Sequence, residues 1–306
     1  MNNYYDCDRD EIIFDNCVFF SLYKTESEYL MLMRHRISNE NPNVNPSVFN
    51  TTYIMRYDTN MNKQNNTQLI DTNRPTHRSY TTGIEDSRFI DDKSFLCVCC
   101  DSNPFWKPEM CYVSFSLDTS TVEKLTPLYI EGIPRKTEKN WLFLKRYSDT
   151  QIDMLYWCNP FKIVRADIIT GSTRIIKEFS VEGITLNAHG GASIFLEPGT
   201  VPVEYENKYL VSIRLFELKP NWPCETYTHS QWILLDSEYN FIGISTPYKW
   251  DHDKSYEINT SLHIKDDILL ATVVLNETNK YIYKLDMNDI FESIEMFNGV
   301  KSLSNA

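Results

Sequence analysis

The 306-residue sequence lacks three features that mark common classes of protein. No run approaches the roughly 18 consecutive apolar residues that are needed to span a bilayer. The first ten residues, Met1–Asp10, are acidic and polar, which is the opposite of a signal peptide. Lysine and arginine number 30 against 42 aspartates and glutamates, and no basic stripe interrupts the formal net charge of −12. We therefore expect a cytoplasmic protein that binds neither nucleic acid nor membrane, because both are bound by clustered cations.

The eight cysteines are interpreted as reduced thiols, since disulfides are rare in the cytosol. In the run FLCVCC, the period of two along a strand would place Cys97 and Cys99 on one face. A zinc site is the alternative interpretation, but no second cysteine pair at zinc-finger spacing accompanies the run. The sequence therefore predicts buried thiols, no metal site and no organic cofactor.

What the sequence does contain is short runs of aromatic and β-branched residues separated by polar turns. Aromatic residues make up 13% of the chain, and many runs alternate between apolar and polar positions, which predicts strands. The expected strands are Cys17–Tyr23, Tyr29–Arg36, Thr52–Tyr57, Ser94–Cys100, Cys111–Leu117, Trp141–Tyr147, Asp153–Cys158, Lys162–Ile168, Lys208–Phe216, Gln231–Asp236, Phe241–Ser245, Ser261–Ile264, Ile268–Leu275 and Lys280–Leu285.

Many short strands with no helices between them are typical of a sandwich, a barrel or a propeller. One amphipathic helix is expected at Met287–Phe297. The segments Ser38–Thr51 and Asn60–Arg78 are rich in Asn, Pro and Thr, which predicts loops. One domain is expected for residues 1–306, and five blades of four strands would use about sixty residues each.

The segment Gly83–Arg88, GIEDSR, combines adjacent carboxylates with an arginine just before an expected strand. Such a group allows one acid to be held by Arg88 while its neighbour donates or accepts a proton. The alternative interpretation is a turn with a surface ion pair.

The segment Glu138–Trp141, EKNW, enters another expected strand. Lys139 and Asn140 could hold a hydroxyl or a phosphate, and Trp141 offers a ring face for stacking. The alternative interpretation is a charged turn followed by a core tryptophan.

The segment His189–Ser193, HGGAS, places an imidazole beside two glycines. The glycines would allow the backbone to approach a ligand, with His189 as the polar contact. The alternative is a structural histidine in a glycine turn.

Together these segments resemble motifs of glycoside hydrolase family 130, a group of five-bladed propellers that includes β-mannoside phosphorylases. GIEDSR is similar to the family's GxEDPR motif, and the EKNW and HGG segments are similar to those of a divergent branch. Further similarities lie at Asn16 with Tyr29–Arg34, and at Thr260–Leu262 with Asp267–Glu277. The expected fold is therefore an all-β, five-bladed propeller with a short C-terminal helix.

The resemblance implies an inverting reaction in which Asp86 is the proton donor, Glu85 binds a sugar hydroxyl and Arg88 orients them. Inorganic phosphate or a sugar phosphate would be the co-substrate, and an oligosaccharide or sugar phosphate the partner. The other residues that would bind substrate are Arg34, Lys139, Asn140, Trp141, His189, Arg214 and Glu277.

Four positions depart from the family pattern. Ser87 replaces a proline, Glu277 replaces an aspartate, and Arg214 stands where this branch has a histidine. The strand Met154–Asn159 lacks the cation that phosphorylases carry there. These departures concern phosphate chemistry more than the fold.

Three functions follow from the resemblance. The first is an inverting mannoside phosphorylase or a hydrolase-like enzyme, and the second is a glycosyltransferase that uses a sugar nucleotide or sugar phosphate. The third is a non-catalytic propeller that presents Trp141, Trp157 and Tyr209 to a glycan. All three require Asp86, Lys139 and His189 to converge around one axial hollow.

Overall fold

The computed structural model describes most of the chain, and the statements below concern these residues. The described ranges are 3–4, 9–11, 17–38, 48–71, 79, 81–105, 107–133, 139–158, 160–179, 193–198, 202–218, 227–251, 257–276 and 279–296. They are almost entirely strands, in five sheets, with one short helix. The fold class is a five-bladed β-propeller, which confirms the expectation from the sequence.

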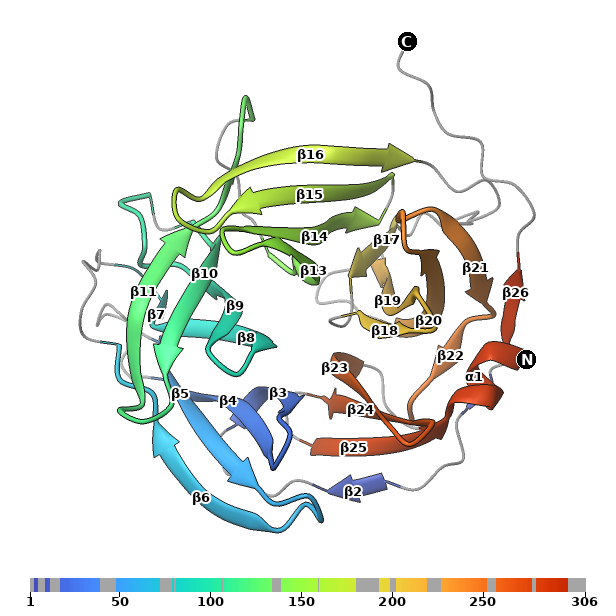
Figure 1. The fold of residues 1–306 in the computed structure, drawn as a ribbon, viewed down its shortest axis with the longest axis horizontal. Helices are drawn as coiled ribbons and strands as arrows, with labels where there is room; N and C mark the ends of the chain where they lie inside the picture. The colour runs from blue at the N-terminus through green and yellow to red at the C-terminus, as the bar shows by residue number, and fades with distance from the viewer. Residues whose placement is uncertain are drawn as a thin grey trace. The chain divides into compact units, whose positions relative to one another are not determined.

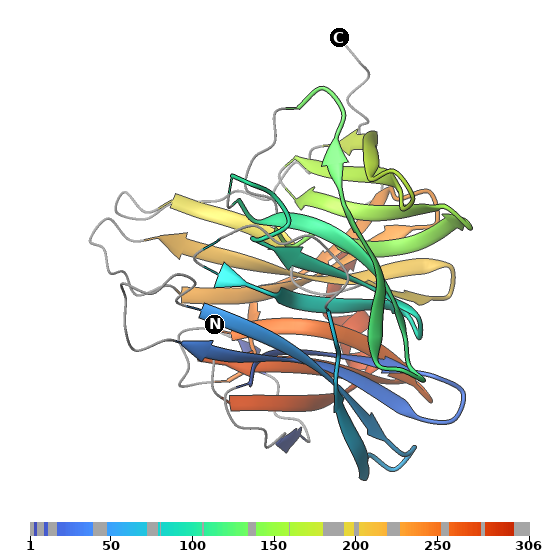
Figure 2. The ribbon, with the colours of Figure 1, turned by 90° about the vertical axis from the view of Figure 1, so that its left-hand side faces the viewer.

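Two of the sheets are built from consecutive antiparallel strands, as Figures 1 and 2 show. The first sheet has the order β3 (Cys17–Lys24), β4 (Tyr29–Ser38), β5 (Val48–Tyr57) and β6 (Lys63–Gln68), with β7 (Thr81–Thr82) parallel to β5. The second sheet has the order β8 (Ile84–Asp91), β9 (Ser94–Cys99), β10 (Glu109–Ser116) and β11 (Thr121–Pro127).

The other three sheets include strands that are distant in sequence. The third sheet has the order β12 (Tyr129–Ile130), β16 (Ser172–Phe179), β15 (Phe161–Asp167), β14 (Gln151–Cys158) and β13 (Leu142–Ser148). The fourth has the order β1 (Asn3–Tyr4), β22 (Tyr248–Lys249), β20 (Tyr227–Asp236), β19 (Lys208–Leu218) and β17 (Ser193–Pro198), together with β18 (Val203–Tyr205), β21 (Phe241–Ser245) and β26 (Ile294–Met296). The fifth has the order β2 (Arg9–Glu11), β25 (Asn279–Asp286), β24 (Ile268–Leu275) and β23 (Glu257–Lys265).

The chain divides into two compact units. Unit 1 comprises residues 1–12, 153–164 and 175–306, and unit 2 comprises residues 13–152 and 165–174. The first and second sheets belong to unit 2, and the described strands of the fourth and fifth sheets belong to unit 1. The single domain expected from the sequence therefore stays a prediction.

Two segments that were expected to be loops contain strands. Val48–Thr51 begin β5, and Lys63–Gln68 form β6. The prediction was wrong for β6 because its sequence, KQNNTQ, has no apolar residue and all six side chains are exposed. It pairs only with β5, so neither face is covered enough to impose an alternating pattern.

The C-terminal helix is shorter than expected. Helix α1 covers Met287–Glu292, and Ile294–Met296 form the strand β26. The Asp286 side chain caps the helix by accepting a hydrogen bond from the Asn288 N–H at 2.8 Å. Only Met287 and Ile290 are buried, so the amphipathic pattern extends over little more than one turn. Within the described part of the chain, no helix is long and apolar enough to cross a membrane.

A hydrophobic core of unit 2 is formed by the first and second sheets. Leu30, Leu32 and Ile54 of the first sheet pack with a cluster from the second that includes Phe89 and Phe95. Cys97, Cys99 and Cys111 belong to this cluster and are fully buried, reduced cysteines. The sulfur atoms of Cys97 and Cys99 are 3.8 Å apart, which confirms that the two share one face of β9.

The core of unit 1 contains a group of packed aromatic rings from three strands and their ends. Trp232 contacts Tyr248 and Trp250, and Trp250 contacts Tyr283. The guanidinium of Arg9, on β2, lies over Tyr281 and Tyr283 and forms an ion pair with Asp251 at 2.9 Å. These contacts join the N-terminal strand to strands near the C-terminus.

Candidate functional site

The GIEDSR segment forms part of a strand and is not a turn before one. In the pairing of β8 with β9, Glu85 lies opposite Val98 and Arg88 opposite Leu96, so β8 contains one extra residue. This is a β-bulge, a feature that re-aims side chains and is common beside active sites. Asp86 lies in the bulge with a φ of +50°, a left-handed conformation that aspartate tolerates better than most residues.

Gly83 allows β5 to approach the start of β8. Its φ is +87°, and a Cβ atom at this position would lie 2.2 Å from the Asn50 carbonyl oxygen. Its N–H donates a hydrogen bond to Asp101 Oδ2 at 3.0 Å. The glycine of the motif is therefore required for packing as well as for backbone conformation.

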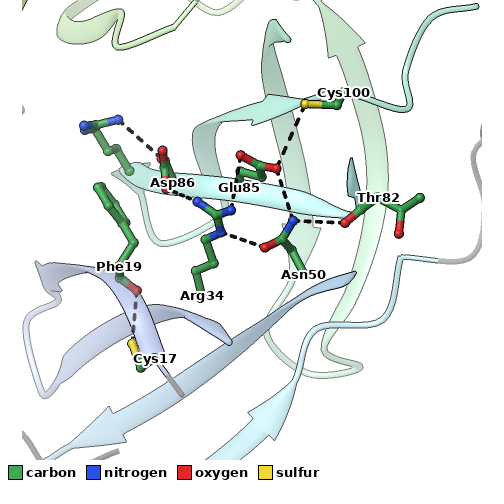
Figure 3. A network of polar contacts seen from close by, with 9 residues as sticks. Cys17, Phe19, Arg34, Asn50, Thr82, Glu85, Asp86 and Cys100 are labelled. Atoms are coloured by element: carbon green, nitrogen blue, oxygen red, sulfur yellow. Dashed lines mark hydrogen bonds and ion pairs between the residues drawn. The ribbon is translucent and has the colours of Figure 1, made fainter. Parts of the chain in front are cut away.

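Arg34, on β4, links the two carboxylates of the motif. Its Nη1 donates a hydrogen bond to Asp86 Oδ1 at 2.8 Å, and its Nη2 lies 3.3 Å from Glu85 Oε2. Figure 3 shows the guanidinium beside both acids. The Arg34 side chain is only 13% exposed, so these ion pairs are largely shielded from water. The resemblance assigned Arg34 to the substrate; its direct contacts are with the carboxylates.

Asn50, on β5, is a member of the site that the sequence analysis did not identify. Its Oδ1 accepts a hydrogen bond from Arg34 Nε at 2.7 Å, and its Nδ2 donates to Glu85 Oε1 and to the Thr82 carbonyl oxygen, each at 3.1 Å (Figure 3). Asn50 lies in the segment that was expected to be a loop, where no periodic pattern places a side chain on a face. The pairing of β4 with β5 brings Asn50 to this site, and the sequence contains no signal that predicts this pairing.

The two carboxyl groups differ in ionisation because their surroundings differ. Burial raises the pKa of Glu85, and the charge of Arg34 only partly offsets this. Burial also raises the pKa of Asp86, but Arg34 and Arg88 outweigh it, so that the pKa of Asp86 is lowered overall. The pKa values of the two carboxyl groups are therefore shifted in opposite directions, upward for Glu85 and downward for Asp86.

Arg88 is almost fully buried beneath the pair. Its guanidinium lies 4.8 Å from the centre of the Phe19 ring, and its Nη1 donates a long hydrogen bond of 3.4 Å to the Asp86 carbonyl oxygen. This arrangement supports the Asp86 backbone in the bulge. The orienting role that the resemblance implies for Arg88 stays a prediction.

Cys100 borders the site at the end of β9. Its thiol lies 4.0 Å from Glu85 Oε1, and burial together with the charge of Glu85 raises the pKa of this thiol to about 11. Cys100 is therefore a neutral thiol at physiological pH and a weak donor to Glu85.

The EKNW segment lies close to the pair. Lys139 is exposed, and its positive charge lowers the pKa of both Glu85 and Asp86. Asn140 has a φ of +62° and is partly buried. Trp141 has no exposed surface, which favours the core-tryptophan interpretation over a stacking face. Glu138 lies outside the described residues.

The structure shows no contact between this site and the other residues that were predicted to bind substrate, as far as these residues are described. His189 and Glu277 lie outside the described residues, as do Asn16 and the side chain of Trp157.

Arg214 is on β19 in unit 1, opposite Glu197 and Ser230, and is 4% exposed. Tyr209 is also buried and packs against Tyr239 with 5.5 Å between ring centres. Lys139 is thus near enough for its charge to act on Asp86, and the convergence of Asp86, Lys139 and His189 around one hollow stays a prediction. Among the described residues, no group of three or more acidic, histidine or cysteine side chains could hold a metal ion.

Solved structures share this fold. The chain superposes with a TM-score of 0.60 on a β-1,2-mannobiose phosphorylase from Listeria innocua, with 12% identity over 93% of this chain and 92% of the other. The fold is similar to that of the mannoside phosphorylases. No family model matches the sequence, and no curated protein matches it either.

Two further structures are similar to a comparable extent. One comes from glycoside hydrolase family 130 of mannoside phosphorylases, a family that contains hydrolases targeting β-1,2-mannosidic linkages. Its TM-score is 0.58, with 11% identity over 89% of this chain and 84% of the other. The second is a glycosyl hydrolase from Bacteroides ovatus, with a TM-score of 0.57, 11% identity, and coverage of 89% and 84%. The similarity to family 130 that the motifs indicated is therefore confirmed for the fold.

Proposed function

We propose that the protein is a carbohydrate-active enzyme that cleaves a glycosidic bond with inversion, and that Asp86 is its proton donor. The observation that carries this proposal is the carboxylate pair on the bulge of β8, where Arg34 contacts both Glu85 and Asp86. Asp86 is the more open of the two acids, with 23% of its side chain exposed against 7% for Glu85. An acid that transfers a proton to substrate must be reachable, whereas an acid that positions it can be buried.

The reaction we propose is phosphorolysis. A phosphate oxygen attacks the anomeric carbon of the sugar, the bond from this carbon to the leaving oxygen breaks, and the proton of Asp86 moves to that oxygen. The products are a sugar 1-phosphate and the shortened acceptor. The exposed cation Lys139, whose charge reaches both carboxyl groups, supports a phosphate beside them.

A bound phosphate would also favour the protonated form of Asp86, which is the form that a proton donor needs. In the free protein the pKa of Asp86 is lowered by Arg34 and Arg88, so the group is a carboxylate at neutral pH. An anion bound nearby favours the protonated form of a carboxyl group and competes for its cations. The acid would thus take up its proton when the co-substrate binds.

The similar structures support a mannoside as the first substrate to test. The Listeria innocua protein is described as a β-1,2-mannobiose phosphorylase in complex with β-1,2-mannobiose. Transfer from a sugar nucleotide or sugar phosphate remains the second expectation from the sequence. The third expectation, a propeller that binds a glycan without turnover, is less well supported, because Trp141 and Tyr209 are buried and their ring faces are not exposed.

The test is release of mannose 1-phosphate from β-1,2-mannobiose with and without phosphate. We expect release only with phosphate, and a fall in kcat of about 10²- to 10⁴-fold for Asp86→Asn, because asparagine keeps the size and tolerates the backbone but cannot donate the proton. Asp92→Asn, at the turn after β8, is the matched control and should be fully active.

The other outcomes assign the alternatives. Release of free mannose without phosphate would mean hydrolysis, and consumption of a nucleotide sugar would mean transfer. Sugar binding that raises the melting temperature equally in wild type and Asp86→Asn, with no turnover of any of these compounds, would contradict the enzyme proposal.

A further inference from the structure

Asn50 lies outside the motif and contacts both Arg34 and Glu85 through its side chain. The orientation of its amide is fixed by chemistry, because Arg34 Nε can only donate and so must face Oδ1. The NH₂ group then points to Glu85 and to the Thr82 carbonyl oxygen. All three contacts are 3.1 Å or shorter, and Asn50 is 9% exposed.

The three nitrogens of the Arg34 guanidinium contact three different side chains. Arginine commonly binds a single carboxylate with two parallel hydrogen bonds. Here Nη1 faces Asp86 and Nη2 faces Glu85, so that one planar cation is divided between two acids. Rotation of the plane toward either acid would break the 2.7 Å hydrogen bond from Nε to Asn50.

We propose that Asn50 is a positioning residue that holds the Arg34 guanidinium divided between Glu85 and Asp86 and prevents a bidentate pair with either one. Without Asn50, Arg34 is free to turn fully onto Asp86. Glu85, which is nearly buried, then loses both the amide donor and the cation. The Asn50 backbone is itself fixed, because its carbonyl packs against Gly83 and its neighbour Phe49 pairs with Thr82.

Other charges also act on the pair, and the proposal concerns what Asn50 adds to them. They come from β4, from β8 and from the segment before β13. The charged groups are Arg34, Arg36, Arg88 and Lys139. The neutral thiol of Cys100 lies 4.0 Å from Glu85 Oε1, and the charge of Asp101 acts on that thiol. Substitution of Asn50 removes none of these groups, so a change in the titration of the pair reports on Asn50 and on the orientation of Arg34.

The decisive experiment is a direct titration of both carboxyl groups in the full chain. Side-chain carboxyl carbons of ¹³C-labelled aspartate and glutamate are followed by NMR from pH 2 to pH 9, and the two signals are assigned from Glu85→Gln and Asp86→Asn. In Asn50→Leu, which has a similar volume, the apparent midpoint of Glu85 should rise by about one pH unit. The midpoint of Asp86 should fall, because Arg34 turns toward it.

A second variant separates orientation from charge. Asn50→Asp keeps an acceptor for Arg34 Nε but places a negative charge beside the pair, so both midpoints should rise. Asn66→Asp adds the same charge on the exposed strand β6 and is the matched control, for which neither midpoint should move. Movement in opposite directions for leucine and in one direction for aspartate is the signature of a positioning role.

Two results would overturn the proposal. One is a folded Asn50→Leu protein whose two midpoints match those of wild type. The other is a rise of both midpoints in that variant, which would mean that Asn50 supplies a hydrogen bond but does not orient Arg34. If Asn50→Leu does not fold, Asn50→Ala is judged by the same criterion.

This inference concerns the same site as the proposed function, but its test does not need activity. If no glycoside is cleaved and the midpoints move as expected, the proposed function fails and the role of Asn50 stands. If glycosides are cleaved and the midpoints do not move, the reverse holds. Where cleavage is observed, the pH limits of kcat in Asn50→Leu should separate from those of wild type as the two midpoints do.

Discussion

At the scale of single residues, the sequence identified the acids and left out what holds them. Glu85, Asp86 and Arg88 are adjacent in the chain, so their types alone indicated a possible proton donor. Asn50 could not be found this way, because its contact with Arg34 depends on the ladder of β4 with β5 and on a tight approach at Gly83. The buried state of Trp141 was equally invisible, since a tryptophan after a turn fits a core as well as a ligand.

Gly83→Ala should destabilise the protein strongly, and Gly132→Ala should not. Both glycines have positive φ, +87° and +74°, so both variants incur backbone strain of about 1 kcal/mol. Only at Gly83 does the new Cβ also meet a carbonyl oxygen, whereas nothing lies within 4 Å at Gly132. Urea unfolding should show an additional loss of about 1–3 kcal/mol for Gly83→Ala. Equal losses in the two variants would contradict the packing role of Gly83.

At the scale of elements, the predictions succeeded where a strand is buried and failed where it is polar. The runs that became β9, β10 and β24 are apolar and almost fully buried, so composition predicted them. β6 has no apolar residue, and the first half of β8 reads as a charged turn because its bulge breaks the alternation. The helix was predicted too long because Ile294 and Met296 fit a helical pattern but form an edge strand.

The end of β22 gives a prediction for pH. The N–H groups of Trp250 and Asp251 donate to the two carboxyl oxygens of Glu257, each at 2.9 Å. Burial nevertheless raises the pKa of Glu257 from 4.5 to about 7. The folded state therefore binds more protons than the unfolded state between these values, so this group contributes stability at low pH that is lost as the pH rises through the window.

Replacement of Glu257 by glutamine should remove this dependence. The free energy of unfolding of wild type, measured with urea at pH 5 and pH 8, should fall relative to that of Glu257→Gln by an amount on the order of 3 kcal/mol. The comparison cancels contributions from other carboxyl groups, which are the same in both proteins. Parallel pH profiles for the two proteins would mean that Glu257 is ionised throughout.

At the scale of the whole molecule, the fold class was predictable and the number of independent parts was not. Short strands without helices reduced the choice to three architectures, and the order of the family-like motifs selected the propeller. The division into two compact units left no mark in the sequence, because the chain passes between them after Ile12, Ile152, Val164 and Arg174 with no linker composition at these points.

We expect the chain to unfold in one cooperative transition. Each unit is assembled from separate stretches of the chain, so that neither can be released by extending a single connection. Far-UV circular dichroism and tryptophan fluorescence should give coincident urea curves, and Gly83→Ala, in unit 2, should shift both curves together. Two separated transitions, with only one displaced by Gly83→Ala, would show that the units are independent domains.

The pairing of β2 with β25 has a consequence for how the protein is made. Arg9 and Tyr283, which contact each other across this ladder, are 274 positions apart. During synthesis β2 leaves the ribosome long before β25 exists, so the edge of β2 stays unpaired until the residues of β25 have been added. Such late pairing of two strands slows folding and leaves the unpaired edge of a strand available for pairing with neighbouring chains. Nascent chains of this protein would therefore be expected to depend on chaperones and to accumulate in aggregates when expressed quickly.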